Sequence, residues 1–85
     1  MNYTIHYAAG DHGEPAKVQL VWNENNPLMP RKGETIVFRN YNEQIRRTYE
    51  VTHVEWETCI PQGKTDPINL RADVYTKLIK TETIG

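Results

Sequence analysis

The feature that most constrains the fold is a long β-rich run, residues 46–58, in which the apolar side chains change parity part-way. The apolar residues concerned are Tyr49 and Val51 before the change and Val54 and Trp56 after it. Since side chains alternate between the two faces of a strand, a change of parity near Thr52-His53 predicts one extra residue, a β-bulge. The run therefore predicts a single long strand that bends across two faces of a small sheet or barrel.

Four further segments alternate apolar and polar side chains and are rich in β-forming residues. They are residues 2–7, 17–22, 35–39 and 72–81. Turn-forming residues separate them, including the Pro30 to Glu34 stretch with its Gly33, which marks the start of the third strand. The first two strands are expected to pair as a hairpin. Apolar residues at helical spacing are not sustained anywhere, although residues 41–47 allow one short turn.

The five runs predict a single all-β domain spanning residues 1–85. We expect a small five-stranded, partly open barrel or a strongly curled antiparallel sheet with one bent, bulged strand, because such shapes reduce exposed sheet edges. A chain of this length buries only about 60–65% of the surface that its unfolded form exposes, so the core must be modest.

Composition limits the cellular setting. Cys59 is the single cysteine, whereas small secreted domains usually need several disulfides, so we expect a reducing cytoplasm. Neither a secretion leader nor an apolar stretch long enough to span a membrane is visible, and the Asn2-Tyr3-Thr4 sequon is read as chance. The net charge of −1 gives no bulk attraction to nucleic acids or membranes, so any such role must depend on a local patch.

The order of several turn and strand residues resembles that of small uncharacterised bacterial and phage proteins with Src-homology-3-like β-barrels. The resemblance covers roughly residues 28–80 and rests on Pro30, Gly33, Glu34, Tyr49, Val51, Val54, Trp56, Val74, Tyr75 and Leu78. It implies a small barrel fold and an origin among mobile elements. Because the activity of such proteins is itself unassigned, the resemblance carries over no catalytic residue.

Metal and catalytic chemistry are poorly supported by the residue spacing. The potential ligands are His6, Asp11, His12, His53 and Cys59, and they lack the paired spacing of structural zinc sites. Cys59 and His53 could act as nucleophile and base, but the sequence supplies no other residues of such a catalytic site. Glu55 and Glu57 are interpreted as solvated charges. We therefore expect no cofactor, no metal and no enzymatic activity.

Charge placement gives the strongest functional indication. Residues 31–47 carry five cations against two carboxylates, a net of +3, whereas residues 50–73 carry a net of −3. The cations are Arg31, Lys32, Arg39, Arg46 and Arg47, interleaved with Phe38 and Tyr41. Aromatic rings beside basic groups are typical of single-strand nucleic-acid grooves, but opposed charged patches suit a protein partner equally well.

The expected function is that of a small non-enzymatic protein-interaction module, phage-encoded and directed at a larger host protein or assembly such as a defence complex. The alternative is a nucleic-acid-binding barrel that uses the basic patch from Arg31 to Arg47. The predicted partner-binding residues are Tyr41, Arg39, Arg46, Arg47, Arg31 and Lys32. Trp22 and Trp56 are expected in the core, with an anchor role as the alternative, and a homodimer through an edge strand is a further alternative.

Overall fold

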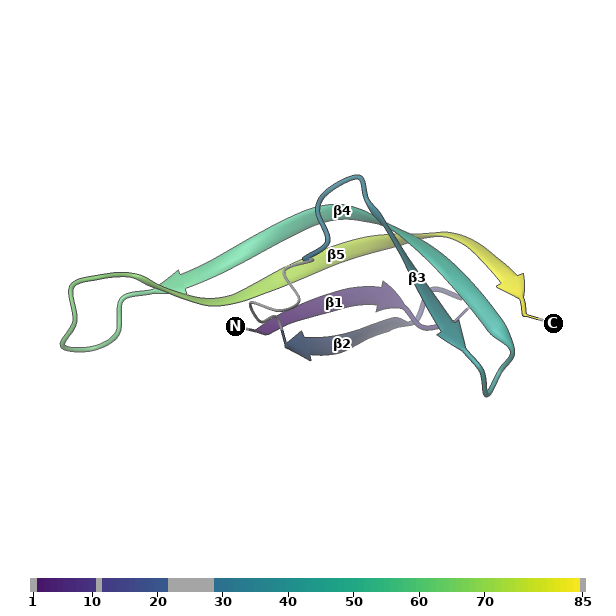
Figure 1. Ribbon diagram of the computed structural model, residues 1–85, viewed down its shortest axis with the longest axis horizontal. Coiled ribbons are helices and arrows are strands. Elements are labelled where there is room, and N and C mark those ends of the chain that lie inside the picture. Colours follow the sequence, from purple (N-terminus) through teal and green to yellow (C-terminus); the bar gives the residue numbers. More distant parts are fainter. Residues whose placement is uncertain (1, 11, 22–28, 85) are drawn as a thin grey trace.

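The computed structural model describes residues 2–10, 12–21 and 29–84, which form five strands and no helix. The strands are β1 (Asn2–Ala8), β2 (Pro15–Val21), β3 (Thr35–Asn40), β4 (Ile45–Cys59) and β5 (Ile68–Thr83). They form one sheet in the order β2-β1-β5-β4-β3, and the sheet curls strongly into a half-barrel (Figure 1). The predicted all-β fold with five strands is confirmed. Within the described residues, no helix is long and apolar enough to cross a membrane.

The sheet is mixed rather than wholly antiparallel. β1 pairs with β2 in the predicted antiparallel hairpin, and β4 pairs antiparallel with both β3 and β5. β1 and β5, however, run parallel, with Ile5 opposite Val74. The expectation of an antiparallel sheet was therefore wrong for this one pairing. The residues of each strand specify alternation between faces, but they do not specify which distant strand becomes the neighbour.

The predicted bulge in the long strand is confirmed. The register between β4 and β5 shifts between Val51 and His53, because Thr52 has no counterpart on β5. Two more shifts lie between Thr48 and Tyr49 and between Glu57 and Thr58. Repeated irregularities of this kind increase local twist and bending, which allows the longest pair of strands to curl instead of lying flat.

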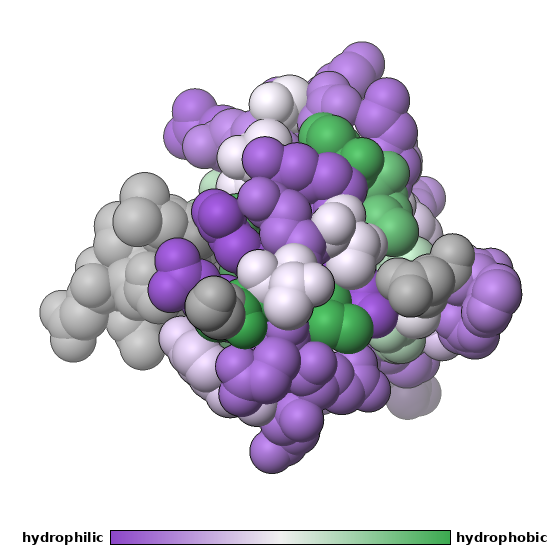
Figure 2. All heavy atoms as spheres, turned by 90° about the vertical axis from the view of Figure 1, so that its right-hand side faces the viewer, coloured by the Kyte–Doolittle hydropathy of each residue, from purple (hydrophilic) through white to green (hydrophobic). Residues whose placement is uncertain are grey.

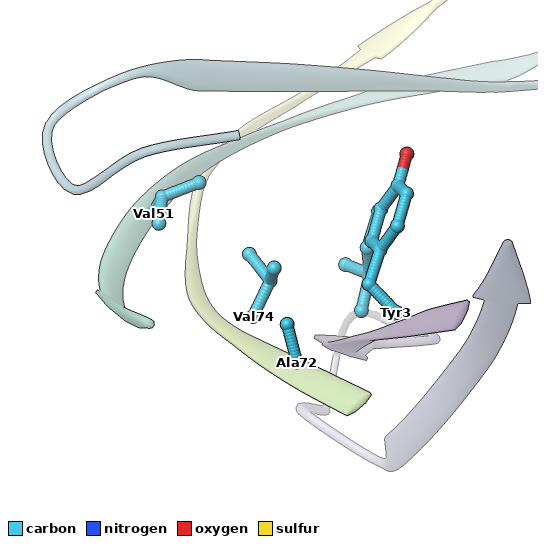
Figure 3. Close-up of a cluster of buried hydrophobic side chains, with 5 residues drawn as sticks. Tyr3, Val51, Ala72 and Val74 are labelled. Atoms are coloured by element: carbon cyan, nitrogen blue, oxygen red, sulfur yellow. The ribbon is translucent and has the colours of Figure 1, made fainter. Parts of the chain in front are cut away.

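A small hydrophobic core lies on the inner face of the curl. Its fully buried members come from three strands, and several point into the enclosed space (Figure 3). They are Tyr3, Ile5, Val51, Ala72 and Val74, each exposed by 7% or less. Tyr49 is buried on the same face, and half-buried apolar side chains such as Phe38 and Val54 surround the cluster. The opposite, outer face of the sheet is predominantly polar.

β3 begins at a tight turn that its sequence dictates. The Glu34 N–H donates to the Arg31 carbonyl over 3.0 Å, and Gly33 adopts a φ of 92°, a value that favours glycine. The Gly33 N–H also donates to the Val51 carbonyl, while the Val51 N–H donates to the Glu34 carbonyl. Gly33 and Glu34 thus both lie opposite Val51 on β4. This arrangement is a glycine bulge, and it sets the register of β3.

The β4–β5 pair extends well beyond the rest of the sheet. β1 begins opposite Arg71, so residues 58–70 project beyond it. This segment, here called the arm, comprises the end of β4, the loop 60–67 and the start of β5, with no third strand among the described residues. The arm is the long loop-ended ribbon at the left of Figure 1. It makes the molecule elongated, with extents of 54 × 27 × 23 Å.

Candidate functional site

A groove opens at the end of the half-barrel opposite the arm. It has a volume of about 660 Å³ and lies between the end of β1, the β3–β4 turn and the start of β4. Its lining includes three predicted site residues, Arg39, Tyr41 and Arg47, together with Tyr7, Phe38 and Tyr49. Figure 2 views this end of the molecule, where hydrophilic residues surround a few apolar spots.

Three aromatic rings join the two sides of the half-barrel in this groove. Tyr7 on β1 stacks on Phe38 on β3 with ring centroids 4.7 Å apart, and Tyr49 meets both rings edge-on. The Tyr49 hydroxyl donates to the carbonyl of Ala8. Burial raises the pKa of Tyr49, and the nearby Arg47 charge offsets part of that rise. The rings therefore hold β3 against β1, and Tyr41, which is 64% exposed, remains open to a partner as expected.

Arg46 and Arg47 lie on opposite faces because side chains alternate along β4. Arg46 sits opposite Arg39 on the outer face and forms an ion pair with Glu82 at 3.5 Å. Arg47 lies opposite Phe38 and is only 8% exposed, with Glu43 at 3.9 Å. Arg47, a predicted partner-binding residue, thus belongs to the lining of the groove but has little exposed surface. Its charge lies in the floor of the groove.

Arg31 and Lys32 are separated from the other predicted site residues. They lie in the turn before β3 and line a second, shallower cavity of about 360 Å³ with Met29, Pro30, His53, Val54 and Trp56. Lys32 and Arg39 are seven positions apart in mostly extended chain, a span of at most roughly 23 Å at about 3.3 Å per residue. The single basic patch predicted from the sequence is thus divided between the two ends of β3.

Trp56 is 48% exposed, so its predicted place in the core was wrong. It sits opposite Ala72, at the root of the arm. At this point the inner face of the sheet extends beyond the part that the rest of the molecule covers. Trp22 lies outside the described residues. Three other large apolar side chains are also exposed and belong to the arm or to the loop at its tip: Ile60, Ile68 and Leu70.

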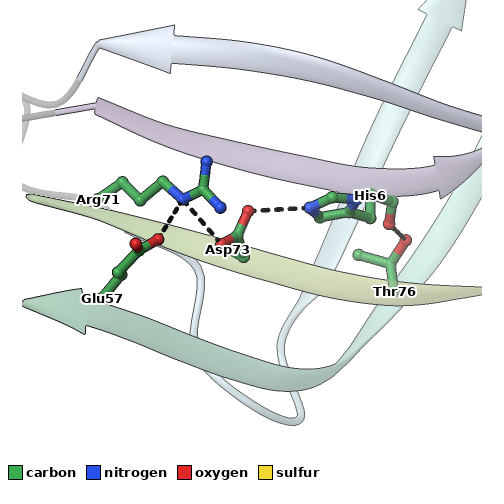
Figure 4. A network of polar contacts seen from close by, with 5 residues as sticks. All are labelled: His6, Glu57, Arg71, Asp73 and Thr76. Atoms are coloured by element: carbon green, nitrogen blue, oxygen red, sulfur yellow. Dashed lines mark hydrogen bonds and ion pairs between the residues drawn. The ribbon is translucent and has the colours of Figure 1, made fainter.

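A polar network that the sequence did not suggest crosses the outer face at the root of the arm (Figure 4). The Arg71 Nε lies 2.7 Å from a Glu57 carboxylate oxygen and 3.4 Å from Asp73, whose other oxygen lies 3.0 Å from His6 Nε2. The His6 ring stacks on Tyr75 at 4.5 Å. His6 and Asp73 are 67 residues apart, and only the parallel pairing of β1 with β5 brings them together. No local pattern could have revealed this contact.

The described residues contain no group of three or more His, Cys, Asp or Glu side chains placed to hold a metal ion. His53 and Cys59 lie on the same strand six residues apart, about 20 Å in extended chain, so they do not form a nucleophile and base. The outer network instead links β1 to β5 through charges and a stacked ring. Through Glu57 it also includes β4, at the root of the arm.

Comparison with known proteins adds no relative. The chain matches no protein-family model, no curated protein and no solved structure. The likeness to small bacterial and phage barrels therefore stays a prediction, and the functional argument depends on the surfaces described above.

Proposed function

We propose that this protein is a non-enzymatic binding module whose arm docks on a larger protein. The observation that carries the proposal is the gathering of exposed apolar side chains on a projection with no third strand among the described residues. Trp56 stands at its root, while Ile68 and Leu70 lie on its strands. An isolated pair of strands is marginally stable in water at best, so a partner surface that covers the arm would also stabilise it.

The root of the arm has the chemistry of an interface anchor. Trp56 shares its 360 Å³ cavity with Arg31 and Lys32, two of the predicted site residues. Tryptophan and arginine are the side chains most often found at binding hot spots, because each combines a large contact area with directional polar contacts. The residue that was expected in the core thus takes the alternative role of a docking anchor.

The resemblance to small phage and bacterial proteins supports a more specific version of this proposal. In it, the chain is phage-encoded, acts in the host cytoplasm and binds or inhibits a larger host assembly such as a defence complex. The arm would reach into a recess of that assembly while the half-barrel stays outside. The small size of the chain agrees with this arrangement.

A matched pair of variants tests the proposal. Trp56→Ala should reduce recovery of a host partner in affinity capture from nuclease-treated lysate by tenfold or more, because truncating a hot-spot anchor costs about 2 kcal/mol or more of binding. Ile79→Ala is the control, since Ile79 is also an exposed apolar side chain but lies nine residues along β5 from Leu70, toward the other end of that strand. Equal recovery by wild type and Trp56→Ala would rule out the arm as the docking element.

The second candidate function is binding of single-stranded nucleic acid in the groove at the other end. It is favoured by one observation, the placement of Arg39, Tyr41 and Arg47 around one opening. If the two arginines that line the groove, Arg39 and Arg47, neutralise two phosphates, the slope of log affinity against log salt should be about −1.4. Tyr41→Ala should weaken binding by about 1–3 kcal/mol by removing a stacking platform. A flat salt dependence with a labelled oligonucleotide would exclude this candidate.

A further inference from the structure

The two edges of the sheet differ in how they are protected against pairing with another strand. On β2, the Ala9 N–H donates to the Glu14 carbonyl, so strand alternation turns the backbone groups of Pro15, Lys17 and Gln19 outward. Proline offers no N–H and an edge lysine disfavours an incoming strand, which are two common ways of blocking an edge. The edge of β2 is therefore guarded.

β3 is less protected, because the residues of its open edge include the cation Arg39 but no proline. The bond from the Val51 N–H to the Glu34 carbonyl fixes the alternation, so the even-numbered residues of β3 turn their backbone groups toward β4. Thr35, Val37 and Arg39 then turn their N–H and C=O groups to the open edge, where no described strand lies. The Val37 side chain is also 40% exposed. Six aligned backbone groups beside an exposed β-branched side chain form a template for strand addition.

We propose that this edge pairs with the same edge of a second copy of the chain, antiparallel, with Val37 on the two-fold axis. In this register Val37 faces Val37, Thr35 faces Arg39 and Ile36 faces Phe38. In this register each residue whose N–H and C=O groups point outward lies opposite another such residue. All outward backbone groups of both strands can then form hydrogen bonds with the other copy. Ile36 and Phe38, both half-buried on the inner face, extend the apolar surface across the junction.

The charges favour this register as well. Arg39 of one copy lies beside Thr35 of the other, and the next residue across that sheet is Glu50. An arginine side chain is long enough to reach a carboxylate one strand further on, so Arg39 would share the Glu50 carboxylate of the second copy with Lys77, which lies 3.5 Å from it. The two Arg39 side chains are themselves four residues out of register, about 14 Å apart along the strands, so they do not repel one another closely.

The pairing leaves the arms free at the outer ends of the joined sheet, so it is independent of the docking function proposed above. A junction of two six-residue strands buries less than the roughly 800 Å² per partner of a standard stable interface. We expect a dimer of micromolar affinity, which dilution dissociates.

Disulfide trapping tests both the pairing and its register. In a Cys59→Ser background, Val37→Cys should cross-link to itself under mild oxidation, because directly opposed residues of this kind have Cα atoms about 5.5 Å apart, within the disulfide range. Thr35→Cys alone and Arg39→Cys alone should not cross-link, since each lies about 14 Å from its own copy. Mixing these two variants should produce the cross-link. Lys17→Cys on the guarded edge is the control.

Sedimentation velocity on uncross-linked protein provides the second measurement. Val37→Lys should shift the chain to monomer by placing two ammonium groups at the axis, whereas Ile79→Lys, also on an exposed apolar residue, should leave the dimer intact. A wild-type chain that stays monomeric at high micromolar concentration would overturn the proposal. So would a dimer that Val37→Lys leaves unchanged but Ile68→Lys dissociates, because the arm would then be the contact.

Discussion

Val74→Ala tests the claim that the half-barrel is held by one small core. Val74 is fully buried, between Ile5 of β1 and Val54 of β4. The substitution removes two methyl groups, worth about 1.6 kcal/mol in transfer free energy at about 0.8 kcal/mol each. A cavity of about 50 Å³ would add roughly 1.2 kcal/mol, for a total of about 2–3 kcal/mol.

That loss is large for this chain, because 85 residues at about 0.05–0.15 kcal/mol each give a total stability of only about 4–13 kcal/mol. Urea unfolding measures it directly. With a slope of about 1 kcal/mol per molar urea, the midpoint should fall by about 2–3 M while the slope stays constant.

The control is Ile79→Ala on the same strand, where the side chain is already 49% exposed. It removes more apolar atoms than Val74→Ala but should cost less, because much of the side chain is hydrated in the folded state. A Val74→Ala cost below about 1 kcal/mol, or one no larger than that of the control, would refute the idea that inner-face burial holds the sheet together.

Three further predictions concern the turn before β3 and the aromatic groove. Gly33→Ala should cost about 1–2 kcal/mol in urea unfolding, because a Cβ disfavours the φ of 92° that Gly33 adopts; an unchanged midpoint would contradict this. Tyr49→Phe should cost about 1–2 kcal/mol, since it leaves the Ala8 carbonyl without its donor, while the three-ring contact stays visible in near-ultraviolet dichroism. Burial raises the pKa of Tyr49 above 10.0, so folding favours its neutral form; stability should hold below pH 10 and fall above it, and the fall should be smaller in Tyr49→Phe.

The sequence predicted the strands and the bulge because both depend on local alternation. The parity change around Thr52 is visible in the residues themselves, and the register shift occurs at that residue. The turn at Gly33 is similarly local, since one residue must adopt a positive φ. Such features need no knowledge of what lies across the sheet.

Features that depend on distant neighbours were not predictable in the same way. The alternation that places Trp56 on the inner face says nothing about whether another element covers that part of the face. Because β4 and β5 extend beyond the start of β1, the root of the arm stays half-exposed. The contact of His6 with Asp73 fails to appear in the sequence for the same reason, as it needs the parallel pairing of two strands from opposite ends of the chain.

The proposed dimer would bring together the two groups of cations that lie apart within one chain. Within one chain Lys32 and Arg39 lie at opposite ends of β3, roughly 23 Å apart in extended backbone. In the paired register, Arg39 of one copy faces Thr35 of the other, which brings Lys32 of that second copy to within about 10 Å along the strand. That is about one Debye length at 0.1 M salt, so cations from two chains would act on a ligand as one patch. The charge cluster that the sequence shows along one chain would then be a property of the pair, and anion binding by Lys32 and Arg39 should weaken on dilution together with the dimer.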